Sequence, residues 1–125
     1  MNPRQEAFNR AVAGLAKQDF AQARIESDQR DGTACAYQTP DGKRCAYGHL
    51  MSDEFLEILR ANGRLSAASS DILAEYSRAP GRGLGTEFIA RLQEAHDYGA
   101  TPTLMKTSLK DFANKYGLEI PEVLK

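Results

Sequence analysis

Residues 35–49 constrain the possible folds of this chain more than any other stretch of its sequence. They contain both cysteines, two of the five tyrosines and one of the two histidines. In their middle, Thr39-Pro40-Asp41-Gly42 is typical of a tight turn, because proline presets φ for a type I turn and glycine readily adopts the left-handed conformation that follows. The pattern predicts a small β-hairpin near residues 34–47. Alternate residues of a strand share a face, and one face of this hairpin would hold Cys35, Tyr37, Cys45 and Tyr47.

Five amphipathic segments surround this stretch, and each is bounded by signals that start or stop a helix. Asn2-Pro3 and Thr101-Pro102 are polar caps followed by proline, and apolar residues then recur at a 3.6-residue period. Thr86 is expected to cap the fourth helix, and Gly63 and Gly117 suit the residue that follows a helix end. The predicted helices cover about residues 3–17, 53–62, 69–79, 87–98 and 102–116.

Residues 18–33 carry mixed signals. Phe20, Ala23 and Ile25 would suit a helix or a strand, whereas residues 28–32 are polar and turn-like, so we expect a partial helix or strand that leads into a loop. A chain of 125 residues is long enough to bury one hydrophobic core. We therefore predict a single domain over residues 1–125 of the α+β class, mostly helical, with about five helices and one small hairpin.

The charge balance limits the classes of partner. With 16 basic and 17 acidic residues, the formal net charge is −1, so overall charge does not indicate nucleic acid or an anionic membrane, although a local basic patch stays open. No apolar run approaches the roughly 18 residues of a membrane span, and residues 1–20 lack the apolar core of a signal peptide. We expect a cytoplasmic protein without membrane association, whose cysteines are thiols. The sequence does not indicate an oligomeric state.

Four interpretations of Cys35 and Cys45 stay open. Thiols packed beneath the hairpin are favoured, since free cysteine is among the most buried residue types. A disulfide would need some distortion, because the predicted register makes the pair diagonal. Structural zinc would use Cys35, Cys45, His49 and His96, of which only Cys45 and His49 have a typical spacing of zinc ligands. No cofactor other than this zinc is predicted.

The fourth interpretation is a thiol-dependent hydrolase, with Cys45 or Cys35 as nucleophile and His96 or His49 as base. Neighbouring residues on a helix point about 100° apart, so Asp97 is not expected to orient the ring of His96. His96 lies at the edge of an apolar stripe near a helix end, which favours a hydrogen-bonded core residue over a base. The residues therefore favour a non-enzymatic protein over this hydrolase.

Two further features suggest binding residues. Arg82 lies in the glycine-rich loop 80–85, which would either cradle an anion with its backbone amides or link two helices. The two tyrosines of the predicted hairpin suit an interaction surface or contacts with the core equally well. The residues singled out for binding are Tyr37, Tyr47, Arg82, His96 and Asp97.

Several motifs occur in order along the chain, namely Cys35-x-Tyr37, Gly42-x-x-Cys45-Ala46-x-Gly48-x-Leu50, Leu92-Gln93-x-Ala95-His96-Asp97 and Phe112-Ala113-x-x-Tyr116-Gly117-Leu118. As a set they resemble a group of small uncharacterised proteins encoded by phages and prophages. The resemblance implies a setting inside a bacterial host cell, and it implies no catalytic residue. His49 departs from that pattern, which usually has an apolar residue at this position, and the departure weakens a zinc site that needs His49.

These observations together predict a small non-enzymatic phage or prophage protein that binds a host macromolecule, a host protein above all, with inhibition of a bacterial defence system as one such role. The alternatives are a thiol-dependent hydrolase and a structural-zinc interaction module. We expect the hairpin to pack against the second and fourth helices, where His96 is the polar residue that meets it. Convergence of the cysteines and histidines would favour zinc, and a thiol beside an imidazole in an open cleft would favour catalysis.

Overall fold

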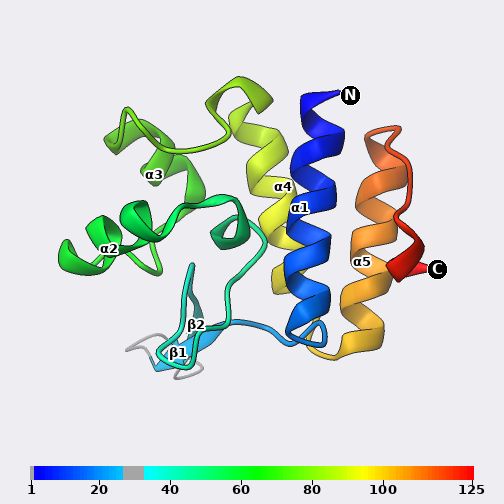
Figure 1. Ribbon diagram of the computed structural model, residues 1–125, viewed down its shortest axis with the longest axis horizontal. Coiled ribbons are helices and arrows are strands. Elements are labelled where there is room, and N and C mark those ends of the chain that lie inside the picture. The colour runs from blue at the N-terminus through cyan, green and yellow to red at the C-terminus, as the bar shows by residue number, and fades with distance from the viewer. Residues whose placement is uncertain (1, 27–32) are drawn as a thin grey trace.

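The computed structural model describes residues 2–26 and 33–125 (Figure 1). Within these residues the helices are α1 (Pro3–Lys17), α2 (Asp53–Ala61), α3 (Ser69–Glu75), α4 (Thr86–Asp97) and α5 (Pro102–Lys115). Two short strands, β1 (Arg24–Glu26) and β2 (Thr33–Cys35), form an antiparallel pair. Short 3-10 turns cover Gly48–Leu50, Arg82–Leu84 and Glu122–Leu124. The expectation of a mostly helical chain with five helices is confirmed.

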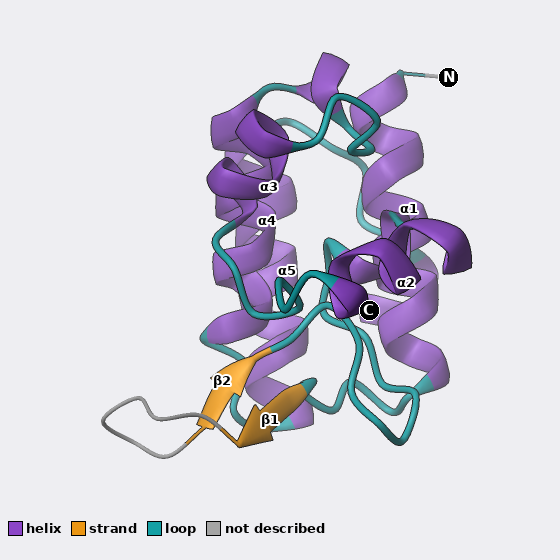
Figure 2. Cartoon of the chain, turned by 90° about the vertical axis from the view of Figure 1, so that its left-hand side faces the viewer, coloured by secondary structure: helices purple, strands orange, loops and turns teal. Residues whose placement is uncertain are grey.

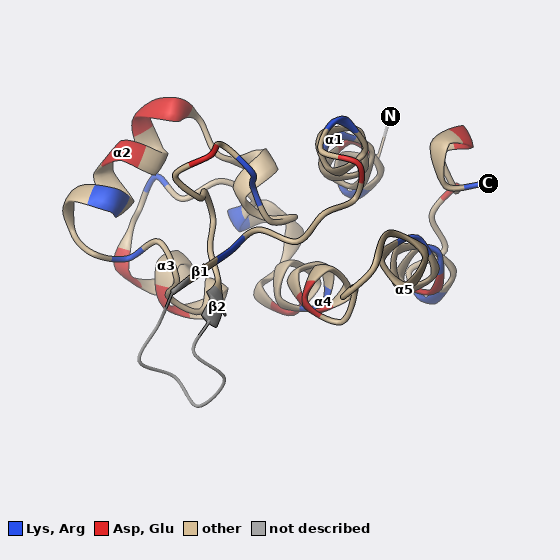
Figure 3. Ribbon diagram, turned by 90° about the horizontal axis from the view of Figure 1, so that it is seen from below, with Lys and Arg blue, Asp and Glu red and all other residues tan. Residues whose placement is uncertain are grey.

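Three of the helices, α1, α4 and α5, lie side by side as a bundle (Figures 1 and 3). The other two, α2 and α3, lie to the left of this bundle in Figure 1, where α3 packs against α4, and segment 36–50 runs between α2 and the bundle. Every helix contributes to one hydrophobic cluster, which includes Phe8, Leu56, Ile72, Phe88 and Phe112. The apolar stripes that the sequence pattern indicates therefore meet in one core.

The helix ends largely follow the local sequence signals. Asn2 Oδ1 accepts the N–H of Arg4 at 2.8 Å, and Thr101 Oγ1 accepts the N–H of Leu104 at 3.2 Å. Thr86 differs from the expectation, because it is the first residue of α4 and no side chain caps that helix. The residue before it, Gly85, has a φ of 98°, which an L-residue rarely adopts. A glycine-based entry into α4 thus replaces the expected threonine cap.

The hairpin predicted near residues 34–47 is not confirmed. The strand pair lies earlier in the chain, where Arg24 is the partner of Cys35. Of the predicted hairpin only the turn is present: the N–H of Thr39 donates to the carbonyl of Lys43 at 2.8 Å, and Gly42 has a φ of 91°. Before the turn, the N–H of Tyr37 donates to the carbonyl of Leu65. This part of the chain therefore pairs with a distant loop and not with the residues that follow the turn.

Tertiary contacts explain why the turn does not continue into a ladder. Tyr47 is fully buried, and its N–H donates to Gln93 Oε1 of α4 at 3.1 Å. The next residue, Gly48, begins a 3-10 turn instead of ending a strand. A cross-strand ladder for residues 43–47 would take these groups away from the core, and burial overrides the local preference for a strand.

The segment that follows α1 contains a sharp change of direction. Asp19 and Phe20 both have left-handed φ values, 56° and 57°, and the chain then runs to β1. Of the stretch 18–33, for which a partial helix or a strand is expected, residues 27–32 lie outside the described residues, and residues 24–26 are a strand. In the described part of the chain, no helix combines the length and the apolar character needed to cross a membrane.

Candidate functional site

A polar cluster lies where the end of α4 meets the strand pair, at the lower end of the molecule in Figure 2. Cys35 Sγ, a ring nitrogen of His96 and a carboxylate oxygen of Asp97 all lie within 4.8 Å of one another. Cys35 is the last residue of β2, and the other two residues end α4. Among the candidates predicted from the sequence, these three are the ones that converge.

Hydrogen bonds determine which nitrogen of His96 carries the proton. The ring is completely buried, and its Nε2 lies 3.2 Å from the backbone nitrogen of Ala23, whose N–H can only donate. Nε2 is therefore the unprotonated acceptor, and Nδ1 carries the proton. Nδ1 lies 2.9 Å from Asp97 Oδ1 and donates to it. Both nitrogen atoms of the ring are thus already engaged.

The expectation that Asp97 would not orient the ring of His96 is wrong. Adjacent side chains do leave a helix in different directions, but Nδ1 is bonded to the ring carbon nearest the backbone, so it stays close to the helix surface. A short aspartate side chain at the last residue of α4 can reach it there. The directional argument holds for the outer nitrogen, Nε2, which points to the backbone just before β1 instead.

The carboxylate of Asp97 collects several donors. Partial burial raises its pKa, but hydrogen bonds from His96, Cys35 and Gln93 act in the opposite direction and outweigh it, so that the pKa lies below the usual value. The Gln93 amide donates to Oδ1 at 3.1 Å. Asp97 is consequently a charged acceptor with a fixed orientation, and 38% of its side chain is exposed.

A pocket of about 340 Å³ opens beside this cluster. Both cysteines line it, together with Tyr37, Gln93 and Asp97. Cys35 is partly exposed, and Arg24 Nη1 lies 3.4 Å from its sulfur. The two thiols are not joined as a disulfide.

Cys45 differs from Cys35 in its surroundings. It is completely buried, and this burial raises the pKa of its thiol to about 12. Its sulfur accepts the N–H of Gly48 at 3.3 Å. A thiol in this environment stays protonated at neutral pH, so Cys45 is suited to packing and not to nucleophilic attack.

The geometry also bears on the two chemical alternatives. A thiol nucleophile needs a base with a lone pair directed at it, whereas His96 gives its lone pair to the N–H of Ala23 and its proton to Asp97. Metal binding through Nδ1 would move the proton to Nε2, where it would face the N–H of Ala23. The cluster has the donor types of a three-ligand zinc site, but the position of Ala23 opposes the tautomer that such a site requires.

The fourth residue of the predicted zinc set lies elsewhere. His49 Nε2 is 3.0 Å from Gln18 Oε1, and the ring lies against α1 at Gly14, in a different pocket from the cysteines. The predicted set of Cys35, Cys45, His49 and His96 therefore does not converge: only Cys35 and His96 of that set meet, together with Asp97.

The remaining binding candidates are engaged in internal contacts. Tyr37 and Tyr47 are buried, and their rings meet edge to face at 5.7 Å. The hydroxyl of Tyr47 donates to the carbonyl of Pro80 at 2.6 Å. Arg82 donates through Nη1 to the carbonyls of Leu73 and Tyr76 at the end of α3, a position where a cation also suits the helix dipole.

Sequence reasoning missed two residues of the site. Gln93 stands one helical turn before Asp97, so spacing alone could have placed the two side chains together. Arg24 reaches Cys35 through the strand pairing, for which the sequence offers no clear signal.

Comparison with known proteins yields no match to a family model, to a curated protein or to a solved structure.

Proposed function

We propose that this chain is a small non-enzymatic phage or prophage protein that binds a host protein, and that the pocket beside Cys35 and Asp97 receives a donor group of that partner. Inhibition of a bacterial defence system, inside the host cell, is the role that we assign to this binding. The proposal depends most on one observation: a carboxylate held by three donors remains 38% exposed at a pocket.

The chemistry of Asp97 supports recognition. Its carboxylate needs no reorganisation to accept an ammonium, guanidinium or amide group, because His96 and Gln93 already fix its orientation. A pre-organised acceptor of this kind loses little entropy on binding. The pocket is also in the size range of sites that take a side chain or a small ligand.

The resemblance to phage and prophage proteins supports the same pocket. Residues from three separate parts of that pattern line it, namely Cys35 and Tyr37, then Cys45, then Gln93 and Asp97. A binding site common to that group of proteins would require motif residues from distant parts of the sequence to meet in one pocket, as they do here.

Affinity capture from a bacterial host lysate tests the proposal. Immobilised wild-type protein should recover a partner in stoichiometric amount. The Asp97→Asn variant should recover at least roughly tenfold less of that partner, because the amide lacks the charge that attracts the donor. Asp111→Asn makes the same chemical change at an exposed site on α5 and should behave as wild type. Circular dichroism of each variant checks that the fold is kept.

Two outcomes would refute this function. Recovery of no stoichiometric partner would argue against a binding protein, and equal recovery with wild type and Asp97→Asn would argue against the pocket.

The convergence of Cys35, His96 and Asp97 favours one alternative, a zinc-containing interaction module. Zinc below about 0.1 equivalent in the purified protein would eliminate it, since a structural site is close to fully loaded. The thiol-dependent hydrolase is tested by changing Cys35 and Cys45 to serine together. An unchanged phenotype in the host would eliminate that reaction.

A further inference from the structure

A second pocket, separate from the one beside Asp97, lies between α1 and the loop that contains Arg44 and His49. Its volume is about 480 Å³. The residues that matter for its chemistry are Arg10, Gly14, Lys17, Gln18, Arg44 and His49. Within the described part of the chain, none of the residues that line this pocket is acidic.

Two cations of this pocket have no counter-ion among the described residues. Arg10 and Lys17 are exposed and lie two turns apart on α1, and neither forms an ion pair with any residue of 2–26 or 33–125. Arg44 is different, because its Nη2 lies 2.5 Å from Asp53 Oδ1 and its Nη1 donates to the carbonyl of Met51. The pocket therefore has two uncompensated cations on one wall and a third, partly neutralised, on the other.

His49 forms a neutral part of the wall. Its Nε2 donates to Gln18 Oε1 at 3.0 Å, and the ring lies so close to α1 that a Cβ at position 14 would be 2.2 Å from its Nδ1. Glycine at position 14 is thus what lets the ring lie against the helix. The pKa of His49 is lowered to about 4, mainly by burial, with Arg44, His96 and Lys17 acting in the same direction.

We propose that this pocket binds the phosphate group of a small ligand, either inorganic phosphate or a phosphate monoester, between Arg10 and Lys17 on α1 and the loop at Arg44. Guanidinium and ammonium groups are the side chains that proteins most often use for phosphate, and a pocket of this size suits a small molecule. The proposal is independent of the partner assigned to the pocket at Asp97.

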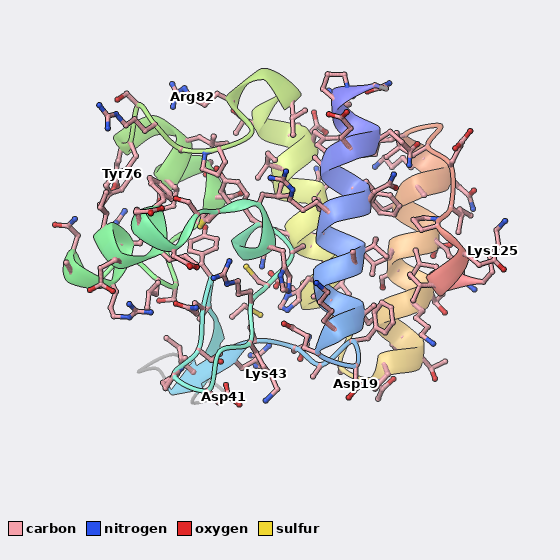
Figure 4. All side chains as sticks on the ribbon, in the orientation of Figure 1. Asp19, Asp41, Lys43, Tyr76, Arg82 and Lys125 are labelled. Atoms are coloured by element: carbon pink, nitrogen blue, oxygen red, sulfur yellow. The ribbon has the colours of Figure 1, made fainter. Side chains whose placement is uncertain are left out.

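The charges around the pocket favour a small ligand over a nucleic-acid strand. Asp41 and Lys43 pair with each other at 2.5 Å on the neighbouring loop, and Asp19 lies at the same edge of the molecule (Figure 4). Lysine and arginine residues are spread over several elements, interspersed with acidic residues, and do not form a continuous track among the described residues (Figure 3). A compact anion needs only the cations of the pocket, whereas a nucleic-acid strand would need a continuous row of cations along the surface.

The chain has only two histidines, which makes NMR a direct test. Inorganic phosphate, and adenosine monophosphate in a parallel series, are titrated into the full chain at constant ionic strength while both imidazole resonances are followed. We expect saturable shifts of the His49 resonances that are much larger than those of His96, which lies in the other site. A bound anion should also raise the pKa of His49, because a nearby negative charge favours the protonated imidazole.

Charge-matched variants complete the test. Lys17→Gln should weaken phosphate binding roughly tenfold, while Lys125→Gln, the same change at the far end of the chain, should leave it unchanged. Three results would overturn the proposal: no saturable shift of His49, an equal shift with chloride, or equal binding by the two variants. Binding of a single-stranded oligonucleotide without any response to phosphate or the nucleotide would overturn it as well, since contact along a surface would then explain the affinity.

Discussion

The bundle of α1, α4 and α5 and the segment 36–50 are held in place by different kinds of contact. In the bundle, aromatic rings from different helices touch: Phe8 stacks on Phe112 at 5.5 Å, and Phe88 meets Phe112 edge to face at 5.2 Å. Arg4 covers the ring of Phe88 at 4.8 Å. The contacts between the aromatic rings are apolar, and their strength depends on shape and buried area.

Segment 36–50 contains no α-helix or strand among its residues, all of which are described, so its backbone groups find other partners. Gln18 accepts the N–H of Arg44 and donates to the carbonyl of the same residue, and Gln93 accepts the N–H of Tyr47. A buried backbone group without a partner is costly, and distant side chains supply these partners here. The comparison shows that apolar periodicity specifies the bundle, whereas segment 36–50 combines buried rings with individual polar contacts to distant side chains.

The largest effect is expected from removing a ring at the centre of the bundle. Phe112→Ala should lower the free energy of unfolding by about 3–5 kcal/mol, because it leaves a cavity against Phe8 and Phe88. Chemical denaturation followed by circular dichroism measures the change. Leu104→Ala is the control on the same helix, where the side chain is 50% exposed, and it should cost less than about 1 kcal/mol. Similar values for the two variants would contradict the view that the bundle depends on its rings.

A smaller effect is expected from the loss of one buried hydroxyl of segment 36–50. Tyr47→Phe keeps the buried ring but leaves the carbonyl of Pro80 without its donor, which should cost about 1–3 kcal/mol. Tyr98→Phe removes the same atom from a side chain that is 71% exposed and should change stability by less than about 0.5 kcal/mol. The same denaturation experiment measures both changes. Equal effects at the two positions would mean that polar contacts do not hold this segment.

The same contrast explains what can be predicted from the sequence. Helices are predictable because their signals are local: Asn2-Pro3 and Thr101-Pro102 start α1 and α5, and apolar residues recur every three or four positions. Segment 36–50 is predictable only in part, since the turn at Thr39–Gly42 is local as well. Its other partners, Leu65 and Gln93, come from distant parts of the chain, and no local pattern indicates them.

The candidate site divides in the same way. Cys35, His96 and Asp97 stand out in the sequence because of their residue types, and the structure brings them together. The role of Ala23 cannot be predicted, because it uses a backbone N–H that every residue except proline has. That single contact determines the tautomer of His96 and with it which chemistries the cluster can support.

The smallest effect concerns the turn, the one part of segment 36–50 that local sequence does specify. Gly42 has a φ of 91°, and a Cβ added there would meet no described atom within 4 Å beyond its chain neighbours, so Gly42→Ala tests backbone conformation without a steric clash. It should cost about 1–2 kcal/mol, measured by thermal or chemical denaturation. Gly83→Ala is the matched control, equally open but without a left-handed φ, and it should be neutral or slightly stabilising. If Gly42→Ala were also neutral, the turn would not constrain the segment, and its long-range polar contacts alone would determine its path.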